Sequence, residues 1–380
     1  MYSCFLTCPR GLERIAQEEL FSFANCESTV DKGGISFNAD KETLYRTNLY
    51  SRVGMHVLVE QLTFSAYSND ELYDSIYNFH WDELISSQQT FSIRVIGHSE
   101  IFNNSQFLTL KIKDAIVDRM RDKTATRASV DKENPDISIT VYIKNDTFKV
   151  YQNSSGSPLF KRGYRTKIHR AALNESLAAG LIYLTKWNKK DPFYDLMCGS
   201  GTIPIEAALM AQNIPPGIFR DKFAFENWND FDSTLFKKIK DIGKKEIRLD
   251  KSISIYGYDI SFQNITLAIS STKSIDLTNK IKFRKQDIKK FSSSEENGTI
   301  LLNPPYGKRL GYPDEDLKKL YNMIGDIFKK KCVGFDAFVF TANLQMAKYI
   351  GLRAKERIIL KNGNLDCRLL YYPIAKGKYT

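Results

Sequence analysis

The chain has 380 residues, of which 42% are hydrophobic and 26% are charged, the balance of an ordinary folded protein with two or three domains. It lacks a run of about 18 apolar residues and a basic N-terminal segment followed by an apolar stretch, so we expect no membrane span, no secretory signal and a cytoplasmic location. The net charge of +11 favours a polyanionic partner such as nucleic acid, and the alternative is a basic surface without such a partner.

The N-terminal part of the chain alternates short apolar strands with amphipathic helices. We expect two small α+β units there, at residues 1–60 and 61–155. The last two strands flank an Asn-Asp turn and are expected to pair as a hairpin. The expected strands are residues 2–7, 34–38, 54–62, 90–97, 137–144 and 146–152, and the expected helices are residues 11–23, 41–49, 69–78 and 105–121.

A polar segment, Asn153-Ser154-Ser155-Gly156-Ser157-Pro158, gives the clearest linker signal, and we place a linker at 156–170. From residue 171 to 380, helices alternate with apolar strands, which predicts an α/β fold with a mostly parallel, doubly wound sheet. An Asn-Gly-Asn turn separates the final two strands, so that edge of the sheet is expected to be antiparallel. The expected helices are residues 171–186 and 204–212, and the seven expected strands are residues 193–197, 253–258, 281–286, 299–302, 337–341, 356–361 and 367–372.

A glycine-containing turn, Asp195-Leu196-Met197-Cys198-Gly199-Ser200-Gly201-Thr202, follows the first of these strands and opens a helix. Glycines in such a turn let the backbone approach a ligand closely, and the helix N-terminus offers N–H groups to an anion. The third glycine of a dinucleotide-binding turn is replaced by Pro204, and the turn does not read as a P-loop. Neither a nicotinamide dinucleotide nor a nucleoside triphosphate is therefore the preferred ligand.

Three aspartates lie at the ends of three expected strands around this turn. Asp195 precedes the glycines and can bind a ligand ammonium, Asp259 suits a ribose diol, and Asp287 can accept from an adenine amino group. Each aspartate alone is equally well explained as a helix cap or a solvated loop residue. Together they describe a nucleoside with an amino-acid tail, which is S-adenosylmethionine. The expected cofactor contacts are Asp195, Cys198, Gly199, Ser200, Gly201, Thr202, Asp259, Ile260, Asp287, Ile288 and Asn303.

A second loop, Asn303-Pro304-Pro305-Tyr306, abruptly ends a buried strand. Its two prolines fix the backbone and remove two N–H donors, so the loop presents acceptors, which suit an amine. The side-chain oxygen of Asn303 and the carbonyl of Pro304 can both accept from one NH2 group and so aim its lone pair at a methyl donor. Tyr306 offers a ring on which an extruded base can stack, worth about 1–3 kcal/mol. The alternative is a tight turn with a packing tyrosine.

Basic residues cluster beside both candidate loops. Lys161, Arg162 and Arg165 surround a Gly-Tyr turn and are candidates for RNA-phosphate contacts, with a solvated linker as the alternative. Lys308 and Arg309 follow the Asn303 loop and are candidates for holding a phosphate. The six cysteines form no CxxC pair and the chain has four histidines, so no metal site is expected.

The chain resembles class I S-adenosylmethionine-dependent methyltransferases of the N6-adenine/N2-guanine type at the glycine turn and the Asn303 loop. More narrowly, it is similar to THUMP-domain RNA methyltransferases, especially the bacterial 23S rRNA guanine-N2-methyltransferase group. The similarity extends to an insertion at 215–228 and to a helix in which Ala172 replaces the usual proline. The segments that carry this narrower resemblance are residues 7–13, 159–165, 171–179, 302–310 and 362–367.

The resemblance implies a ferredoxin-like unit at 1–60, a THUMP RNA-binding domain at 61–155 and a Rossmann-like class I methyltransferase domain at 171–380. It implies structured RNA as the partner, either 23S rRNA or a ribosome assembly intermediate. The loop itself serves both guanine N2 and adenine N6, so an adenine-N6 or tRNA guanine-N2 enzyme, a DNA or protein amine methyltransferase, and a non-catalytic RNA-binding assembly factor stay open.

Overall fold

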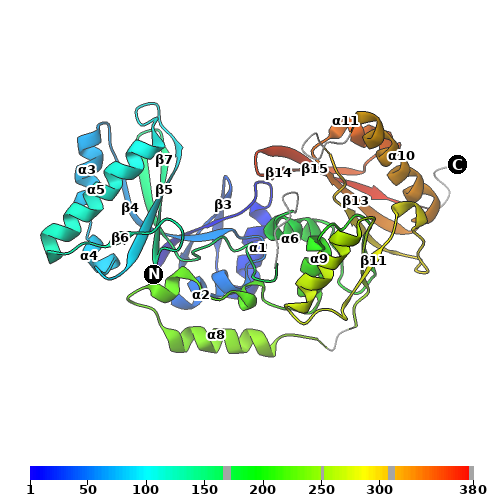
Figure 1. The fold of residues 1–380 in the computed structure, drawn as a ribbon, viewed down its shortest axis with the longest axis horizontal. Helices are drawn as coiled ribbons and strands as arrows, with labels where there is room; N and C mark the ends of the chain where they lie inside the picture. Colours follow the sequence, from blue (N-terminus) through cyan, green and yellow to red (C-terminus); the bar gives the residue numbers. More distant parts are fainter. Residues whose placement is uncertain (166–172, 250–251, 307–312, 376–380) are drawn as a thin grey trace.

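Two β-sheets, one in each half of the chain, organise the fold of this computed structural model (Figure 1). The structure describes residues 1–165, 173–249, 252–306 and 313–375. Among these residues, no helix combines the length and the apolar character that crossing a membrane requires.

The N-terminal sheet has eight strands in the order β2-β3-β1-β4-β8-β7-β5-β6. Its strands are β1 (Tyr2–Thr7), β2 (Ser28–Asp31), β3 (Gly34–Ala39), β4 (His56–Ser65), β5 (Thr90–His98), β6 (Ser129–Val130), β7 (Ile137–Lys144) and β8 (Thr147–Asn153). The helices of this half are α1 (Glu13–Ala24), α2 (Lys41–Tyr50), α3 (Asn69–Tyr77), α4 (Trp81–Leu84) and α5 (Ser105–Thr124).

Strand β4 joins the two predicted N-terminal units into one sheet. It pairs with β1 through residues 56–59 and with β8 through residues 58–65, so the predicted division at residues 60 and 61 falls inside a strand. Hydrogen bonding of the sheet therefore continues across that division. The predicted hairpin of β7 and β8 is confirmed as an antiparallel pair.

The expected linker signal at 153–158 is misleading in its first half, because Ser154 and Ser155 are fully buried. Asn48 on α2 binds both hydroxyls: its amide nitrogen donates to Ser154 Oγ at 2.9 Å, and its carbonyl oxygen accepts from Ser155 Oγ at 2.6 Å. Arg220 donates to the carbonyls of Ser155 and Ser157 at 3.1 and 2.8 Å. The polar side chains here satisfy one another's hydrogen bonds inside the protein. A segment with the composition of a linker is therefore a packed junction.

The C-terminal sheet has seven strands in the order β11-β10-β9-β12-β13-β15-β14, as predicted mostly parallel. Its strands are β9 (Phe193–Asp195), β10 (Ile255–Asp259), β11 (Ile281–Lys285), β12 (Gly298–Leu302), β13 (Phe335–Thr341), β14 (Glu356–Asn362) and β15 (Leu365–Pro373). Its main helices are α6 (Glu175–Leu184), α7 (Thr202–Ala211), α8 (Ser233–Lys245), α9 (Phe262–Lys273), α10 (Asp314–Lys331) and α11 (Leu344–Ala347).

The order of the C-terminal sheet reverses between β9 and β12, which lie side by side and parallel. The predicted antiparallel edge is confirmed, since β15 runs antiparallel to both β13 and β14. In an open α/β sheet, ligands bind beyond the carboxyl ends of the strands at such a reversal. The fold therefore brings the ends of β9 and β12 to the expected ligand edge.

The two halves are packed together and share one hydrophobic core. A Cβ atom added to Gly180 on α6 would lie 2.2 Å from a methyl carbon of Leu12, so the absence of a side chain lets the helix approach the N-terminal unit. The backbone of Lys361 on β14 also donates to the carbonyl of Arg10 at 3.2 Å. The N-terminal unit therefore contacts both α6 and the antiparallel edge of the C-terminal sheet.

Candidate active site

The glycine turn between β9 and α7 has two glycines with different surroundings. Gly199 and Gly201 both adopt left-handed conformations, with φ of 53° and 84°. No atom of the described structure lies within 4 Å of the place where a Cβ of Gly199 would stand, whereas a Cβ at Gly201 would lie 2.8 Å from Ala268. Gly201 thus allows close packing against α9, and Gly199 leaves one side of its backbone open to a ligand.

Asp259, at the end of β10, holds the glycine turn in place. Its Oδ2 accepts from the backbone N–H of Gly199 at 2.9 Å. Its Oδ1 accepts from the backbone N–H of Ser261 at 2.8 Å and from the side chain of Asn264 at 3.1 Å. The sequence suggested a ribose contact for this carboxylate, and the structure adds a support role that the sequence did not predict.

Asp195, the last residue of β9, is buried at the foot of the same turn, with 1% of its surface exposed. Burial raises the pKa of its carboxyl group to about 8, the N–H of Met197 opposes that rise, and the charge of Asp259 adds to it. A buried carboxyl group of this kind is well suited to a cationic partner, because a positive charge would favour its ionised form.

The remaining expected cofactor residues surround the turn at different depths. Asp287 is half-buried beyond β11 and accepts from the N–H of Lys289 at 2.9 Å. Ile288 is buried, and Ile260 is 68% exposed directly after Asp259. Cys198 and Thr202 are buried, and Ser200 is half-buried.

Asn303 follows β12, directly beside the end of β9. Its Oδ1 is buried and has no hydrogen-bond partner among the described residues. Leaving a buried acceptor unsatisfied costs about 1–3 kcal/mol, so this atom requires a donor. Paired parallel strands lie about 4.8 Å apart, and the register of β12 with β9 carries Asn303 and Asp195 to the same edge of the sheet. The register therefore places Asn303, with its unsatisfied oxygen, at the sheet edge where the glycine turn begins.

Tyr306 is held on two sides. Its hydroxyl accepts a hydrogen bond from the side-chain amide of Asn362 at 2.9 Å. Its ring meets Phe340 on β13 edge-to-face, with ring centres 6.4 Å apart and planes at 86°. Asn362 ends β14, and the sequence indicated only a turn there, so this contact was missed. In the same loop Pro304 is buried and Pro305 is half-buried.

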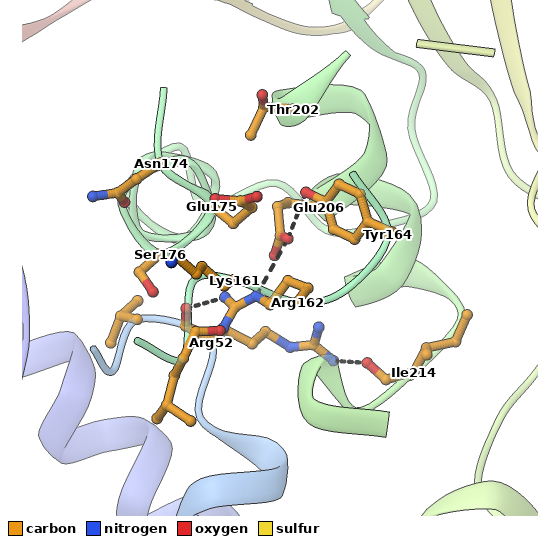
Figure 2. A network of polar contacts seen from close by, with 12 residues as sticks. Arg52, Lys161, Arg162, Tyr164, Asn174, Glu175, Ser176, Thr202, Glu206 and Ile214 are labelled. Atoms are coloured by element: carbon orange, nitrogen blue, oxygen red, sulfur yellow. Dashed lines mark hydrogen bonds and ion pairs between the residues drawn. The ribbon is translucent and has the colours of Figure 1, made fainter. Parts of the chain in front are cut away.

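The prediction that Arg162 contacts RNA phosphates is wrong. Arg162 is 1% exposed, and its guanidinium donates to the carbonyls of Leu159 and Arg52 (Figure 2). Its Nε lies 3.5 Å from the carboxylate of Glu206, which is completely buried on α7. A guanidinium enclosed by these partners cannot reach a phosphate. Tyr164 donates to the same carboxylate at 3.1 Å.

Arg165 is also mostly buried, and its side chain binds the glycine turn inside the protein. Its Nε lies 3.0 Å from the carboxylate of Glu175 on α6, and its Nη2 donates both to the carbonyl of Leu173 and to the hydroxyl of Thr202. Burial raises the pKa of Glu175 to about 7, although the charge of Arg165 lowers it. Of the three basic residues in this segment, Lys161 alone is exposed, and its RNA contact stays a prediction.

The charged network in Figure 2 joins the N-terminal half to the helix of the glycine turn. Arg52, which precedes β4, donates to the carbonyl of Ile214 at 2.9 Å, beyond the end of α7. Arg162 links the carbonyl of Arg52 to Glu206 in the middle of α7. These buried bonds fix α7, and with it the glycine turn, relative to the N-terminal unit.

Two further expectations concern phosphate binding after the Asn303 loop and the absence of a metal site. Lys308 and Arg309 lie outside the described residues. Within residues 1–165, 173–249, 252–306 and 313–375, no group of three or more His, Cys, Asp or Glu side chains comes together in a way that suits a metal ion.

Comparison with known protein families matches the chain in three consecutive segments. The RlmL ferredoxin-like domain matches residues 3–58, the THUMP domain matches residues 66–160, and the RMKL-like methyltransferase domain matches residues 162–371.

Two curated relatives match along almost the whole chain. A Synechocystis protein that carries the name of an RNA methyltransferase is 38% identical over 370 residues, which cover 97% of this chain and 96% of the relative. The ribosomal RNA large subunit methyltransferase K/L of Shewanella frigidimarina is 34% identical over 382 residues, which cover 98% of this chain. The chain spans about half the length of the Shewanella protein, 53%.

Solved structures match at full length. SMU.472, assigned as a methyltransferase and complexed with SAH, has a TM-score of 0.90 at 27% identity, covering 99% of both chains. A Listeria monocytogenes protein assigned as an N6-adenine-specific DNA methylase has a TM-score of 0.87 at 28% identity, covering 98% of this chain and 96% of that one. TrmN from Thermus thermophilus, at 17% identity and a TM-score of 0.70, shares the fold.

Proposed function

The chain belongs to the RMKL-like methyltransferase family, and we propose that it transfers a methyl group from S-adenosylmethionine to the exocyclic N2 amine of a guanine in 23S rRNA. At the coarser level it is an S-adenosylmethionine-dependent RNA methyltransferase with a THUMP domain. Which base is methylated, at which atom and in which RNA are the parts that we propose.

The observation that carries the proposal is the buried, unpartnered Oδ1 of Asn303 beside the glycine turn. An exocyclic amine carries two N–H donors and can satisfy this oxygen with one of them. The carbonyl of Pro304 is proposed to accept the other. Two acceptors would fix the plane of the amine and leave its lone pair aimed along the sheet edge toward the end of β9.

The residues around the turn fit S-adenosylmethionine. Asp195 would face the ammonium group of the cofactor, and the open side of Gly199 would lie against the cofactor. Asp259 would bind the ribose, and Asp287 would accept a hydrogen bond from the adenine amino group. Cys198, Ser200, Thr202, Ile260 and Ile288 are proposed to line the same site. Because Asp259 already holds Gly199, ribose binding and the shape of the turn would be coupled.

When bound, S-adenosylmethionine supplies a methyl group on a positively charged sulfur, which an amine displaces directly: the N–C bond forms and the C–S bond breaks. The protein needs no strong base before this step, because the extra proton can leave the product amine to water afterwards. Asn303 and Pro304 act by holding the nitrogen in line, and Tyr306 acts by holding the base. Catalysis is then mainly proximity and orientation.

Adenine N6 and a tRNA guanine remain the nearest alternatives, since they offer the same amine to the same loop. DNA is a further alternative substrate, because the chain is similar to the Listeria protein assigned as a DNA methylase. The THUMP match, the excess of basic residues and the names of the curated relatives favour RNA. Guanine N2 in 23S rRNA is favoured over these by the resemblance described from the sequence.

Mass spectrometry of rRNA nucleosides tests the proposal. We expect 23S rRNA from a strain lacking this gene to have lost one N2-methylguanosine, and the purified protein with labelled S-adenosylmethionine to restore it. Loss of N6-methyladenosine instead would overturn the guanine assignment. A 23S rRNA with unchanged modifications, together with labelling of tRNA, would overturn the choice of RNA.

A further inference from the structure

The amino-acid end of S-adenosylmethionine carries an ammonium group and a carboxylate, and Asp195 suits the ammonium group alone. A carboxylate that enters the same partly enclosed site is repelled by a carboxyl group, so it requires a cation or strong hydrogen-bond donors of its own. Within the part of the chain that the structure describes, Arg165 is the one basic side chain bonded to the glycine turn, residues 195–202.

Three protein groups hold the Arg165 guanidinium at the start of α7. Its Nε lies 3.0 Å from the carboxylate of Glu175, in the first turn of α6. Its Nη2 donates to the carbonyl of Leu173 at 2.8 Å and to the hydroxyl of Thr202, the first residue of α7. The guanidinium is therefore fixed at the place where α6 and α7 both begin.

One nitrogen of this guanidinium keeps both of its hydrogens for another partner. A guanidinium has five N–H donors, and Glu175, Leu173 and Thr202 occupy those on Nε and Nη2. Nη1 makes no hydrogen bond to the residues that the structure describes. Since 14% of the Arg165 side chain is exposed, a ligand can reach it, whereas Arg162 is enclosed.

Thr202 can supply a further donor at the same place. Its hydroxyl oxygen accepts from Arg165, which leaves its own O–H available to donate. Thr202 closes the glycine turn and Asp195 opens it, with the open side of Gly199 between them in the chain. The turn therefore has a carboxyl group at one end and donors backed by a positive charge at the other.

We propose that Arg165 binds the carboxylate of S-adenosylmethionine through Nη1, with the hydroxyl of Thr202 as a second donor. This assignment deepens the proposed function and rests on its placement of the amino-acid end of the cofactor at the glycine turn. Hydrogen bonds from arginine to a carboxylate are about twice as strong as those between neutral groups. The anion that Arg165 binds is then the cofactor and not an RNA phosphate.

Arg165 belongs to the segment that joins the two halves of the chain. In the same segment, Arg162 donates to the carbonyl of Arg52 in the N-terminal half and lies 3.5 Å from Glu206 on α7 (Figure 2). A cofactor held by Arg165 would therefore contact the segment that fixes α7 relative to the N-terminal unit.

The test compares two ligands of the full chain by calorimetry, S-adenosylmethionine and decarboxylated S-adenosylmethionine, which keeps the nucleoside, the sulfonium and the ammonium group. We expect the unmodified chain to bind the decarboxylated ligand at least about 10-fold more weakly. Arg165→Met should weaken binding of S-adenosylmethionine by at least about 10-fold and change binding of the decarboxylated ligand by less than about 2-fold.

Two further variants separate binding from folding. Arg165→Met combined with Glu175→Gln avoids a buried carboxylate without its cation and should show the same selective loss. Lys190→Met removes an equal charge at the exposed amino end of β9 and should bind both ligands normally.

Equal losses for the two ligands in the Arg165 variants would show that Arg165 only shapes the turn, and would overturn the proposal. An unmodified chain that binds both ligands equally well would overturn it without any variant. The assay contains no RNA, so a wrong assignment of the methylated base would leave its result unaffected.

Discussion

The side-chain amide of Asn362 donates a 2.9 Å hydrogen bond to the hydroxyl of Tyr306, which ties the end of β14 to the loop after β12. The antiparallel edge of the sheet thereby fixes the ring proposed to carry the target base. Since the backbone of Lys361 also binds the carbonyl of Arg10, that edge is in turn supported by the N-terminal unit.

Removing the Asn362 amide should loosen Tyr306 without touching the cofactor site. We expect Asn362→Ala to lower the rate of methyl transfer to RNA by about 3- to 10-fold, the value of one hydrogen bond, with unchanged affinity for S-adenosylmethionine. Steady-state kinetics with labelled cofactor measures this. Asn364→Ala, on the exposed turn of the same hairpin, is the control and should transfer at the normal rate. Equal losses in both variants would argue against the positioning role.

The buried pair of Arg162 and Glu206 should dominate the stability of the junction. Arg162→Met leaves the carboxylate of Glu206 buried without its cation, a change that typically costs about 3–5 kcal/mol. Lys161→Met, at the exposed neighbour, should cost less than about 0.5 kcal/mol. Urea unfolding of both variants gives the comparison. An Arg162→Met protein as stable as the unmodified one would contradict the burial that removed Arg162 from the RNA contacts.

The raised pKa of Asp195 makes stability depend on pH. The unfolded carboxyl group ionises near 3.8, whereas burial holds the folded one protonated up to about 8. The folded state therefore binds more protons between these values, and the free energy of unfolding should fall as pH rises through that window, by at most about 1.4 kcal/mol per pH unit.

Asp195→Asn removes this titration. We expect the variant to gain stability relative to the unmodified protein from pH 5.5 to pH 8, as followed by urea unfolding, with a constant difference above pH 8. A difference between the two proteins that does not vary with pH would show that the Asp195 carboxyl group is ionised throughout.

The two glycines of the turn should respond differently to alanine. Both substitutions carry a backbone cost of about 1–2 kcal/mol for the left-handed conformation. Gly201→Ala adds a clash with Ala268 and should be the less stable in urea unfolding. Gly199→Ala meets no protein atom, so we expect it to keep most of its stability but to bind S-adenosylmethionine at least about 10-fold more weakly in calorimetry. Normal affinity in Gly199→Ala would remove this glycine from the proposed cofactor site.

Much of the fold followed from hydrophobic periodicity. Strand β1 and strand β7 have the predicted bounds, and the antiparallel edge followed from the turn at Asn362. Strand β2 was not predicted, because Ser28–Asp31 is polar and exposed and has no buried face to mark it. Hydrophobic periodicity predicts an element when one of its faces is buried. It misses a strand that is held by backbone pairing alone.

The burial and ion pairing of Arg162 and Arg165 could not be predicted from the sequence around them. A run of basic residues around a glycine has the composition of a phosphate-binding surface. Their partners Glu206 and Glu175 come later in the chain, and only the fold brings them together. By contrast, a ligand site at the ends of β9 and β12 agrees with a general rule, since ligands of doubly wound sheets bind where the strand order reverses.

The rate of methyl transfer by Asn303→Ala tests directly whether Asn303 holds the target amine. Single-turnover transfer from labelled S-adenosylmethionine to 23S rRNA should fall at least about 100-fold, because the amine loses the buried acceptor that orients it, while calorimetry should show that the cofactor still binds. Transfer at the rate of the unmodified protein would contradict the central claim that Asn303 holds the target amine.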